Sequence, residues 1–423
     1  MRHAILIPLC LTLLAPAARA ADETKTAAGV KFRAQEIDKS LKVGYGVKIV
    51  DLNGDGKLDI AVADSARVVW FSNPDWKLHT VVQNKDAGIK TDNVALDAYD
   101  IDGDGKTDIA LGADWQPSNT KAGGSLHWLK QGRNIDEPWK AYPIDAPIPT
   151  LHRIKFADLD ADGKAELIVG PLHGANATAR GNWLDGGGVQ VLSFKAPKDP
   201  AKDKWERRVL DESLHVMHNF LPVPMDGLAA PGGGPKKLNL LTASYEGVNL
   251  ATFSGDGKAT LMKVGAGDQS NPAASRGSSE IRTGRLKQTP LIATVEPFHG
   301  TRVVAYTPPA GASGLWKRTV LDEDLGGGHA LWVADLDGDG ADEIVAGWRD
   351  TVPGKTPPGV NIYKADSAGT AWQKHPLEKG GVATEDLACA DLNGDGRTDI
   401  VAVGRATRNV KIYWNEGSAA RAE

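Results

Sequence analysis

The sequence predicts an all-β protein: a seven-bladed β-propeller whose last blade is closed by a strand near the N-terminus. Three observations favour this fold. A nine-residue acidic loop recurs five times along the 423-residue chain, short apolar segments flank each copy, and a further strand with an aromatic start recurs between the loops. Four short strands per unit, repeated around a ring, are typical of a β-propeller.

The acidic loop has the composition of a calcium-binding turn. Every copy has oxygen-bearing side chains at positions 1, 3, 5 and 9 and a glycine at position 6. Calcium takes several oxygen ligands, and the glycine permits the sharp turn, so we expect about five structural calcium ions. The expected ligands are Asp51, Asn53, Asp55, Asp59, Asp100, Asp102, Asp104, Asp108, Asp158, Asp160, Asp162, Glu166, Asp335, Asp337, Asp339, Glu343, Asp391, Asn393, Asp395 and Asp399.

The loop differs from that of an EF-hand. An EF-hand supplies a bidentate glutamate at position 12 and has a helix on each side. Here position 12 is apolar in every copy and the segment that follows the loop is rich in β-branched residues. We therefore expect each loop to join the first and second strands of a blade.

The number of blades follows from the fourth strands, which begin at an aromatic residue and end at an acidic or polar one. These strands are expected at 76–83, 139–145, 205–211, 316–322 and 372–378, with a weaker copy at 259–264. The seventh is 31–38, which precedes any first strand, whereas the C-terminal blade stops at Asn415 after its third strand. We expect these two segments to pair, because that pairing removes exposed sheet edges.

Two units lack the acidic loop. The unit around 238–242 has the glycine-rich segment 231–235 in its place, and the unit at 290–300 has no run of aspartates, so neither is assigned a calcium ion. The segments 196–204 and 266–289 are predicted to be irregular surface loops. Apart from these departures, the repeats resemble those of the FG-GAP and VCBS repeat families, which implies a calcium-binding propeller of the kind found in integrins and secreted bacterial proteins.

The N-terminus predicts export. Residues 1–20 match a signal peptide with an Ala-x-Ala cleavage site, which implies a periplasmic or extracellular protein whose residues 21–423 form a single propeller. No later stretch is long and apolar enough to span a bilayer. The formal net charge of −5 argues against a nucleic-acid surface, and we expect a monomer.

The candidate functional residues are those that interrupt the repeat on the face opposite the calcium loops. The residues six positions before the loops are Tyr45, Val94, His152, His329 and Glu385, and an alignment of the fourth unit adds His215. The ends of the second strands contribute a further polar set: His173, Tyr245, Glu246, Trp348, Arg349 and Arg405. Lys287 or Gln288 is expected to join them from the fifth blade, whereas His299 is expected at the calcium-loop face.

Three histidines at one height around a channel predict a functional site. Neutral imidazoles with an open position suit zinc or another divalent transition metal, which would polarise a substrate carbonyl. Either this metal or the arginines would serve as the electrophile, and Tyr245, a free histidine or Glu385 would serve as the base. The candidate catalytic residues are therefore His152, His215, His329, Tyr245, Arg349, Glu385 and Arg405. Trp332 and Trp348 fit either core packing or a sugar-stacking platform.

Three segments carry a second, narrower resemblance. Residues 328–335, 346–349 and 404–415 are similar to the propeller of the aldos-2-ulose dehydratases. This resemblance implies elimination of water from keto-sugars such as anhydrofructose, with a metal in the propeller channel.

Two functions stay open at this stage. The first is a carbon–oxygen lyase acting on carbohydrate, which predicts a transition metal in addition to calcium. The second is a non-catalytic module of the integrin-like FG-GAP type that binds a polysaccharide or a protein, which predicts calcium only. A propeller hosts unrelated functions, so the fold itself does not choose between them.

Overall fold

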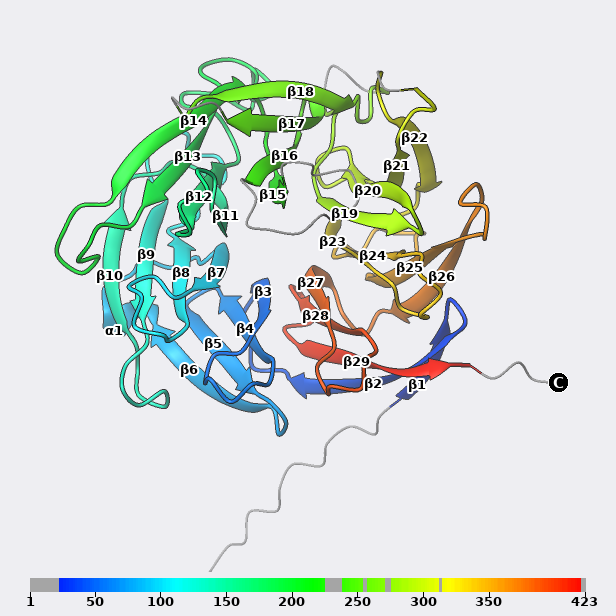
Figure 1. The fold of residues 1–423 in the computed structure, drawn as a ribbon, viewed down its shortest axis with the longest axis horizontal. Helices are drawn as coiled ribbons and strands as arrows, with labels where there is room; N and C mark the ends of the chain where they lie inside the picture. Colours follow the sequence, from blue (N-terminus) through cyan, green and yellow to red (C-terminus); the bar gives the residue numbers. More distant parts are fainter. Residues whose placement is uncertain (1–22, 225–237, 254–256, 271–274, 312–313, 420–423) are drawn as a thin grey trace, which may run out of the picture.

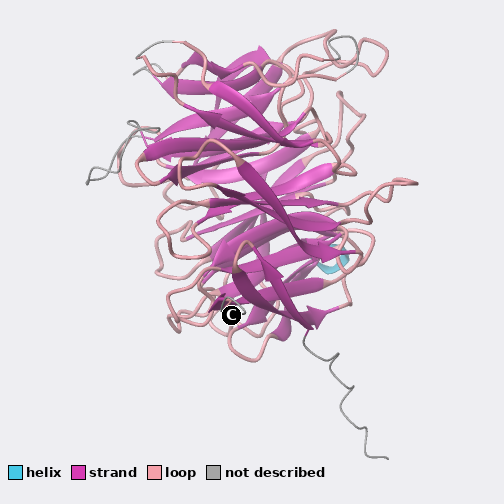
Figure 2. Cartoon of the chain, turned by 90° about the vertical axis from the view of Figure 1, so that its right-hand side faces the viewer, coloured by secondary structure: helices cyan, strands magenta, loops and turns pink. Residues whose placement is uncertain are grey.

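The computed structural model describes residues 23–224, 238–253, 257–270, 275–311 and 314–419. The predicted signal peptide and the glycine-rich segment 231–235 lie outside these ranges. The described residues form seven small antiparallel sheets arranged in a ring, which confirms the seven-bladed propeller (Figure 1). In each blade the first strand lies nearest the ring axis, and the side view shows strands throughout with loops at both faces (Figure 2).

The first three blades follow the predicted order of strands. Blade 1 contains β3 (Gly44–Val50), β4 (Asp59–Asp64), β5 (Arg67–Ser72) and β6 (Lys77–Gln83). Blade 2 contains β7 (Ala95–Tyr99), β8 (Asp108–Ala113), β9 (Ser125–Lys130) and β10 (Lys140–Asp145). Blade 3 contains β11 (Leu151–Ala157), β12 (Glu166–Pro171), β13 (Val189–Lys195) and β14 (Glu206–Leu214).

Blades 4 to 6 complete most of the ring. Blade 4 contains β15 (Asn219–Pro224), β16 (Leu238–Ser244), β17 (Gly247–Phe253) and β18 (Ala259–Gly265). Blade 5 contains β19 (Ile281–Leu286), β20 (Thr289–Glu296), β21 (Arg302–Thr307) and β22 (Lys317–Asp322). Blade 6 contains β23 (Gly328–Ala334), β24 (Glu343–Trp348), β25 (Gly359–Ala365) and β26 (Trp372–Lys379).

Blade 7 joins the two ends of the chain, as predicted. Its strands from the axis outward are β27 (Thr384–Ala390), β28 (Asp399–Gly404), β29 (Val410–Ser418), β2 (Val30–Asp38) and β1 (Glu23–Ala27). β2 pairs antiparallel with β29, with Ala34 opposite Tyr413. The outermost strand β1 is an addition that the repeat pattern did not predict. The helix of the described chain is α1 (Asn84–Ala87), and no described helix is long and apolar enough to cross a membrane.

An apolar core lies at each of the seven blade interfaces. For example, Ile60 and Val62 of blade 1 pack with Val401 and Val403 of blade 7. Second strands such as β4 and β8 are buried along their whole length, because both of their faces contact a neighbouring blade. Burial on both faces explains why the segments after the acidic loops are continuously apolar rather than alternating.

Blade 5 differs from the sequence prediction by one strand. Its first strand, β19, lies within the segment 266–289 that was predicted to be an irregular loop, and the strand beginning near Pro290 is the second strand. Lys287 and Gln288 form the two-residue turn between them, since Leu286 pairs with Thr289. These two residues therefore lie at the calcium-loop face, and the connection that contains His299 lies at the opposite face. Both placements reverse the predicted ones.

Candidate functional site

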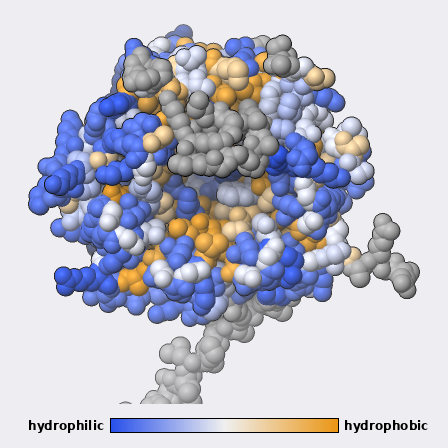
Figure 3. All heavy atoms as spheres, viewed as in Figure 1, coloured by the Kyte–Doolittle hydropathy of each residue, from blue (hydrophilic) through white to orange (hydrophobic). Residues whose placement is uncertain are grey.

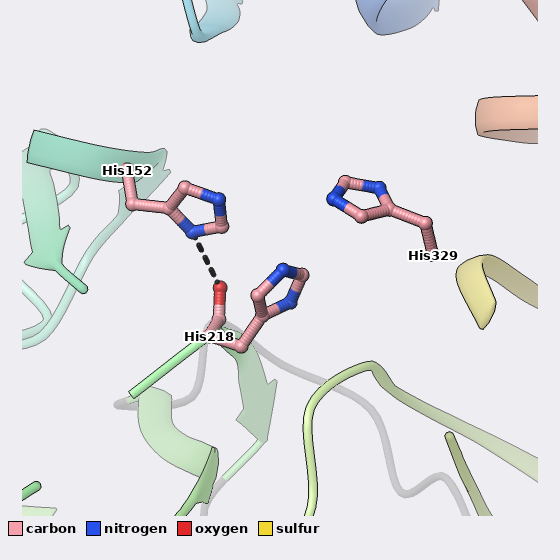
Figure 4. Close-up of side chains that lie close together, drawn as sticks. All are labelled: His152, His218 and His329. Atoms are coloured by element: carbon pink, nitrogen blue, oxygen red, sulfur yellow. Dashed lines mark hydrogen bonds between the residues drawn. The ribbon is translucent and has the colours of Figure 1, made fainter. Parts of the chain in front are cut away.

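Three histidines from three blades meet at the centre of the ring, on the face opposite the acidic loops (Figure 4). His152 is the second residue of β11, His329 is the second residue of β23, and His218 directly precedes β15. Each offers a ring nitrogen, and these nitrogens all lie within 4.8 Å of one another. All three side chains are buried. We call this set the histidine triad.

Two imidazoles of the triad donate from Nδ1 to a backbone carbonyl oxygen, and the third has a carboxylate close to Nδ1. Nδ1 of His152 donates to the carbonyl oxygen of His218 at 2.9 Å, and Nδ1 of His329 donates to the carbonyl oxygen of Glu385 at 2.6 Å. Nδ1 of His218 lies 2.9 Å from a carboxylate oxygen of Glu280. Acceptors at Nδ1 fix the tautomer and leave the Nε2 lone pair for a metal, which is the usual arrangement of metal-binding histidines.

Burial keeps the triad neutral. It lowers the pKa of His152 and His329 well below the usual value and that of His218 to about 4. A neutral imidazole is the form that binds a metal. The sequence interpretation therefore selected two of the three residues correctly.

The prediction that His215 belongs to this ring is wrong. Strand β15 begins at Asn219, so the position equivalent to His152 is occupied by His218. The segment 214–218 contains two histidines, His215 and His218, three positions apart. The sequence alignment placed His215, rather than His218, opposite His152. His215 instead contacts Glu246, with Nδ1 2.8 Å from a carboxylate oxygen, and its side chain is 28% exposed.

A fourth imidazole adjoins the triad. Nε2 of His299 lies 3.0 Å from Nε2 of His218, and the ring centres of His299 and His329 are 4.9 Å apart. Arg349 donates from Nη2 to Nδ1 of His299 at 3.3 Å. The prediction that His299 lies at the calcium-loop face is wrong, because it took the second strand of blade 5, β20, for the first.

Two buried carboxylates neutralise the arginines around the imidazoles. Arg349 donates from Nη1 to both carboxylate oxygens of Glu385 at 2.7 and 2.8 Å, and Arg405 donates to one of them at 2.8 Å. Arg153 donates to Glu280 at 3.0 Å. Burial acts to raise the pKa of Glu280, but Arg153 and His218 outweigh it and lower the value to about 2. Glu280 is therefore ionised beside the triad.

Glu385 is held by hydrogen bonds from two arginines, Arg349 and Arg405. Its two oxygens accept three guanidinium N–H bonds, two from Arg349 and one from Arg405. Glu385 therefore holds Arg349 and Arg405 in place beside the triad. Arg153 also donates from Nη1 to Nε2 of His152 at 3.3 Å, so a metal bound there would replace this contact.

An aromatic wall flanks the triad. The ring of Trp115 lies 5.0 Å from that of His152, Phe298 stacks on His299 at 3.9 Å, and Trp183 stacks on His173 at 4.0 Å. Trp115, Trp183 and Phe298 are half-buried and pack with Tyr245, which the sequence had selected. We call Trp115, Trp183, Phe298 and Tyr245 the aromatic wall.

Sequence reasoning missed three members of the aromatic wall and Glu280. Trp115 lies two residues after the second strand β8, one position beyond the place that Arg349 takes after β24, so a slightly wider strand-end rule would have found it. No comparable signal marked Trp183, Phe298 or Glu280, which lie on connections between strands. Trp348, predicted as either core or platform, is 1% exposed within the core between blades 5 and 6.

The residues of the triad fit a divalent transition metal. Three neutral nitrogen donors from three blades, with a carboxylate behind one of them, match the ligand types that zinc and similar ions prefer. The site is buried, and the ionised Glu280 lies beside His218.

The five acidic loops form the turns that the sequence predicted. In all five of them the backbone amide of the position-6 glycine donates to the position-1 carboxylate, as in the bond from Gly56 N to Asp51 at 2.9 Å. The position-6 glycines have φ between 82° and 86°, a conformation that disfavours other residues. Carboxylates of three loops lie within 4.8 Å of one another, as a cation site requires: Asp100, Asp102 and Asp108; Asp158, Asp160 and Glu166; and Asp335, Asp337 and Asp339.

Comparison with known proteins confirms both resemblances. The model of the β-propeller domain of aldos-2-ulose dehydratase matches residues 123–309, and the model of the FG-GAP-like repeat matches residues 51–111 and 335–402. Aldos-2-ulose dehydratase of Phanerodontia chrysosporium is 25% identical over 391 residues, which cover 85% of this chain. This chain spans 40% of the length of that relative. The dehydratase match includes His152, His218 and His299.

Two solved structures share the fold at low identity. The extracellular domain of a hybrid two-component system of B. thetaiotaomicron aligns with a TM-score of 0.50 and 11% identity, covering 90% of this chain and 39% of its own. The structure of BBS1N in complex with ARL6DN aligns with a TM-score of 0.51 and 13% identity, covering 91% of this chain and 96% of that one. At these identities the likeness supports the propeller fold alone.

Proposed function

We propose that this propeller, similar in sequence to the propeller of aldos-2-ulose dehydratase, is a metal-dependent lyase that eliminates water from a keto-sugar at the histidine triad. The observation that carries the proposal is the triad itself, whose three buried imidazoles bring ring nitrogens within 4.8 Å of one another. Two of them donate from Nδ1 to backbone carbonyl oxygens, and the third has Nδ1 beside the Glu280 carboxylate. Such an arrangement is rarely needed for packing, because buried polar groups add a desolvation penalty. The similarity to an aldos-2-ulose dehydratase supports carbohydrate as the substrate class.

Elimination next to a carbonyl requires an electrophile and a base. A divalent metal, when bound by His152, His218 and His329, supplies a Lewis acid that polarises a carbonyl oxygen. Arg349 and Arg405 are held by Glu385 near this position and stabilise negative charge that develops on the same oxygen. These arginines also orient the hydroxyl groups of a sugar.

The structure favours His215 as the base. Its Nδ1 lies against the carboxylate of Glu246, so Nε2 carries the lone pair, as in carboxylate-assisted histidine bases. The partly exposed ring is accessible to substrate, and the neighbouring Val216 packs with Tyr245 and the aromatic wall. His215 takes the proton from the carbon next to the carbonyl. The carbon–carbon double bond forms, and the proton then leaves with the departing hydroxyl group as water.

The aromatic wall is the proposed platform for the sugar ring. Half-buried indole and phenyl faces next to a polar site are suited to the apolar face of a pyranose. Trp115 contacts the triad residue His152 and Phe298 contacts His299, so a ring seated on the wall lies beside the imidazoles.

The test combines metal content with product formation. Purified protein is incubated with keto-sugars, and a new enone absorbance is recorded for the wild type, His329→Ala and His215→Gln. We expect His329→Ala to lose both the metal and the activity, and His215→Gln to keep the metal but lose about 100-fold in rate. His375→Ala on β26, away from the site, is the matched control. Equal activity in His329→Ala and the wild type would contradict the lyase proposal.

The FG-GAP-like matches in blades 1, 2, 6 and 7 support a second candidate, a calcium-binding propeller that binds polysaccharide or protein without catalysis. A protein that retains calcium but no transition metal, and that produces no enone, would favour this function. We further propose that the protein is exported and that calcium occupies the acidic loops, where the ligand spacing supports it.

A further inference from the structure

A separate cavity of about 540 Å³ lies on the axis of the propeller and is lined by the first strands of all seven blades. Figure 3 shows the molecule hollowed at the centre of the ring. The cavity adjoins the histidine triad at Arg153 and Asn219 but extends away from it, past Lys48, Trp332 and Asp386. The proposed lyase chemistry uses none of the residues deeper in the cavity.

The cavity has more positive than negative charge. Its lining contains four cationic side chains, Lys48, Arg153, Lys155 and Arg282, and two carboxylates, Asp97 and Asp386. Lys48 forms an ion pair with Asp97. Arg153 forms an ion pair with Glu280, which is not part of the cavity lining. Asp386 accepts backbone N–H bonds from Val47 at 3.0 Å and Leu387 at 2.9 Å.

Neither Lys155 nor Arg282 forms an ion pair with a described residue, although Asp97 lies near Lys155, and Asp386 and Glu280 lie near Arg282. Within the described ranges of the chain, no carboxylate oxygen lies at ion-pair distance from either side chain. Arg282 donates from Nη1 to the Ile281 carbonyl oxygen at 2.8 Å and lies over Trp332, 4.9 Å from the ring centre. Burial, together with the positive charge of Arg282, lowers the pKa of Lys155 to about 8.

Two cationic side chains that line the same cavity, neither with a carboxylate at ion-pair distance, favour a counter-charge. An anion bound between them would supply it, with charge-assisted hydrogen bonds from the ammonium and guanidinium groups. The apolar lining, which includes Trp332, Phe156 and Leu387, favours an organic rather than an inorganic ion. The volume is in the range of sites for small molecules.

We propose that the axial cavity is a second binding site, which takes a small organic anion through a carboxylate or phosphate group held between Lys155 and Arg282. The site is distinct from the histidine triad, so it stands whether or not the lyase proposal holds. A ligand bound in this cavity would lie on the propeller axis, as the triad does, and Arg153 would lie between the two sites.

The test is calorimetric titration of the protein with three probes of similar size: glucuronate, glucose 6-phosphate and uncharged glucose. We expect saturable one-to-one binding of at least one charged probe and none of glucose in this cavity. Comparing the two charged probes distinguishes a carboxylate ligand from a phosphate ligand. Binding of neither charged probe, or equal binding of glucose, would overturn the proposal.

Substitutions of the two cationic residues test whether the charged probe binds in this cavity. Lys155→Met and Arg282→Gln should each weaken the affinity for the charged probe about tenfold or more, because each removes a charge-assisted hydrogen bond. Lys155→Arg should retain most of the affinity, and Lys42→Met removes the same charge from an exposed position as the control. Circular dichroism and metal content verify that each variant is folded. Undiminished binding in both cavity variants, with fold and metal intact, would contradict the assignment.

Discussion

Individual hydrogen bonds decide which imidazole can bind a metal. His152 and His329 use backbone carbonyl oxygens as Nδ1 acceptors, so only a change in the backbone would alter their tautomer. His218 depends on a side chain, Glu280, which Arg153 and Asn219 hold in place. Glu280 is therefore the residue through which the metal affinity can be changed without removing a ligand.

We predict that Glu280→Gln weakens metal affinity about 10- to 100-fold, the usual effect of losing a carboxylate behind a metal-binding histidine. The amide keeps the size of the side chain but not its charge, so Arg153 also loses its ion-pair partner. The measurement is a competition titration with a chromophoric chelator. An unchanged affinity would show that Nδ1 of His218 needs no anionic acceptor.

Lys155 gives a prediction on pH and stability. The groups that face it are Arg282, Lys48, Arg153 and Asp97. Burial and the cations lower its pKa from 10.5 to about 8 in the folded protein, so between these pH values the unfolded chain binds more protons. Stability should therefore rise with pH across this window, and Lys155 should destabilise the fold below pH 8.

The corresponding experiment compares the wild type with Lys155→Met in buffer free of small organic anions. We expect the variant to be more stable by about 1–3 kcal/mol at pH 7, with the difference shrinking as the pH approaches 10. Denaturant unfolding at several pH values measures it. A variant that is less stable at pH 7 would mean that Lys155 has a favourable partner.

At the scale of the element, the acidic loops fall into two groups. In blades 2, 3 and 6 a lysine at or near the end of the third strand contacts the loop carboxylates, and position 3 of the loop is an aspartate. These lysines are Lys130, Lys195 and Lys364. In blades 1 and 7 position 3 is Asn53 or Asn393, and the equivalent strand positions are Ser72 and Trp414. The loops with an aspartate at position 3 therefore also have a lysine beside them on the third strand, and the loops with an asparagine at position 3 do not.

We predict that Lys130→Met increases calcium-dependent stabilisation, because the ammonium group competes with the cation for Asp102 and Asp104. Without calcium the variant should be less stable, since four carboxylates are left unbalanced. Thermal unfolding with calcium and with a chelator gives the two values, and Lys140→Met on the neighbouring strand is the control. An identical calcium response in Lys130→Met and the wild type would contradict this competition.

The same loops explain which parts of the structure were predictable. Each loop marks the joint between a first and a second strand, so His152, His329, Glu385 and the strand ends beside them were placed correctly from sequence. Blades 4 and 5 lack the marker. The alignment therefore selected His215 over His218, and a two-residue turn at Lys287 and Gln288 was not recognised. Glu280, which contacts His218 and Arg153, lies on a connection far from both in sequence. Local sequence patterns do not reveal such a contact.

At the scale of the whole molecule, closure of the ring depends on the pairing of β2 with β29. Phe32 of β2 is fully buried, and it belongs to the core that joins blades 6 and 7. The ring holds the triad residues of blades 3, 4 and 6 in place, so opening it would separate the ligands.

We predict that Phe32→Ala destabilises the protein by about 3–5 kcal/mol, the range for removing a buried phenyl ring. The neighbouring Lys31→Ala should change stability little, because Lys31 is exposed and pairs with Glu416 at the surface. Chemical denaturation of the two variants measures the difference. Equal stability would indicate that β2 does not contribute to ring closure.

The most direct test of the central claim is elemental mass spectrometry of the dialysed protein, run beside His152→Ala and His329→Ala. We predict about one equivalent of zinc or a similar divalent transition metal in the wild type, absent from both variants, with calcium unchanged at about five equivalents. No transition metal in the wild type, or an equal amount in the variants, would contradict a metal site at the histidine triad.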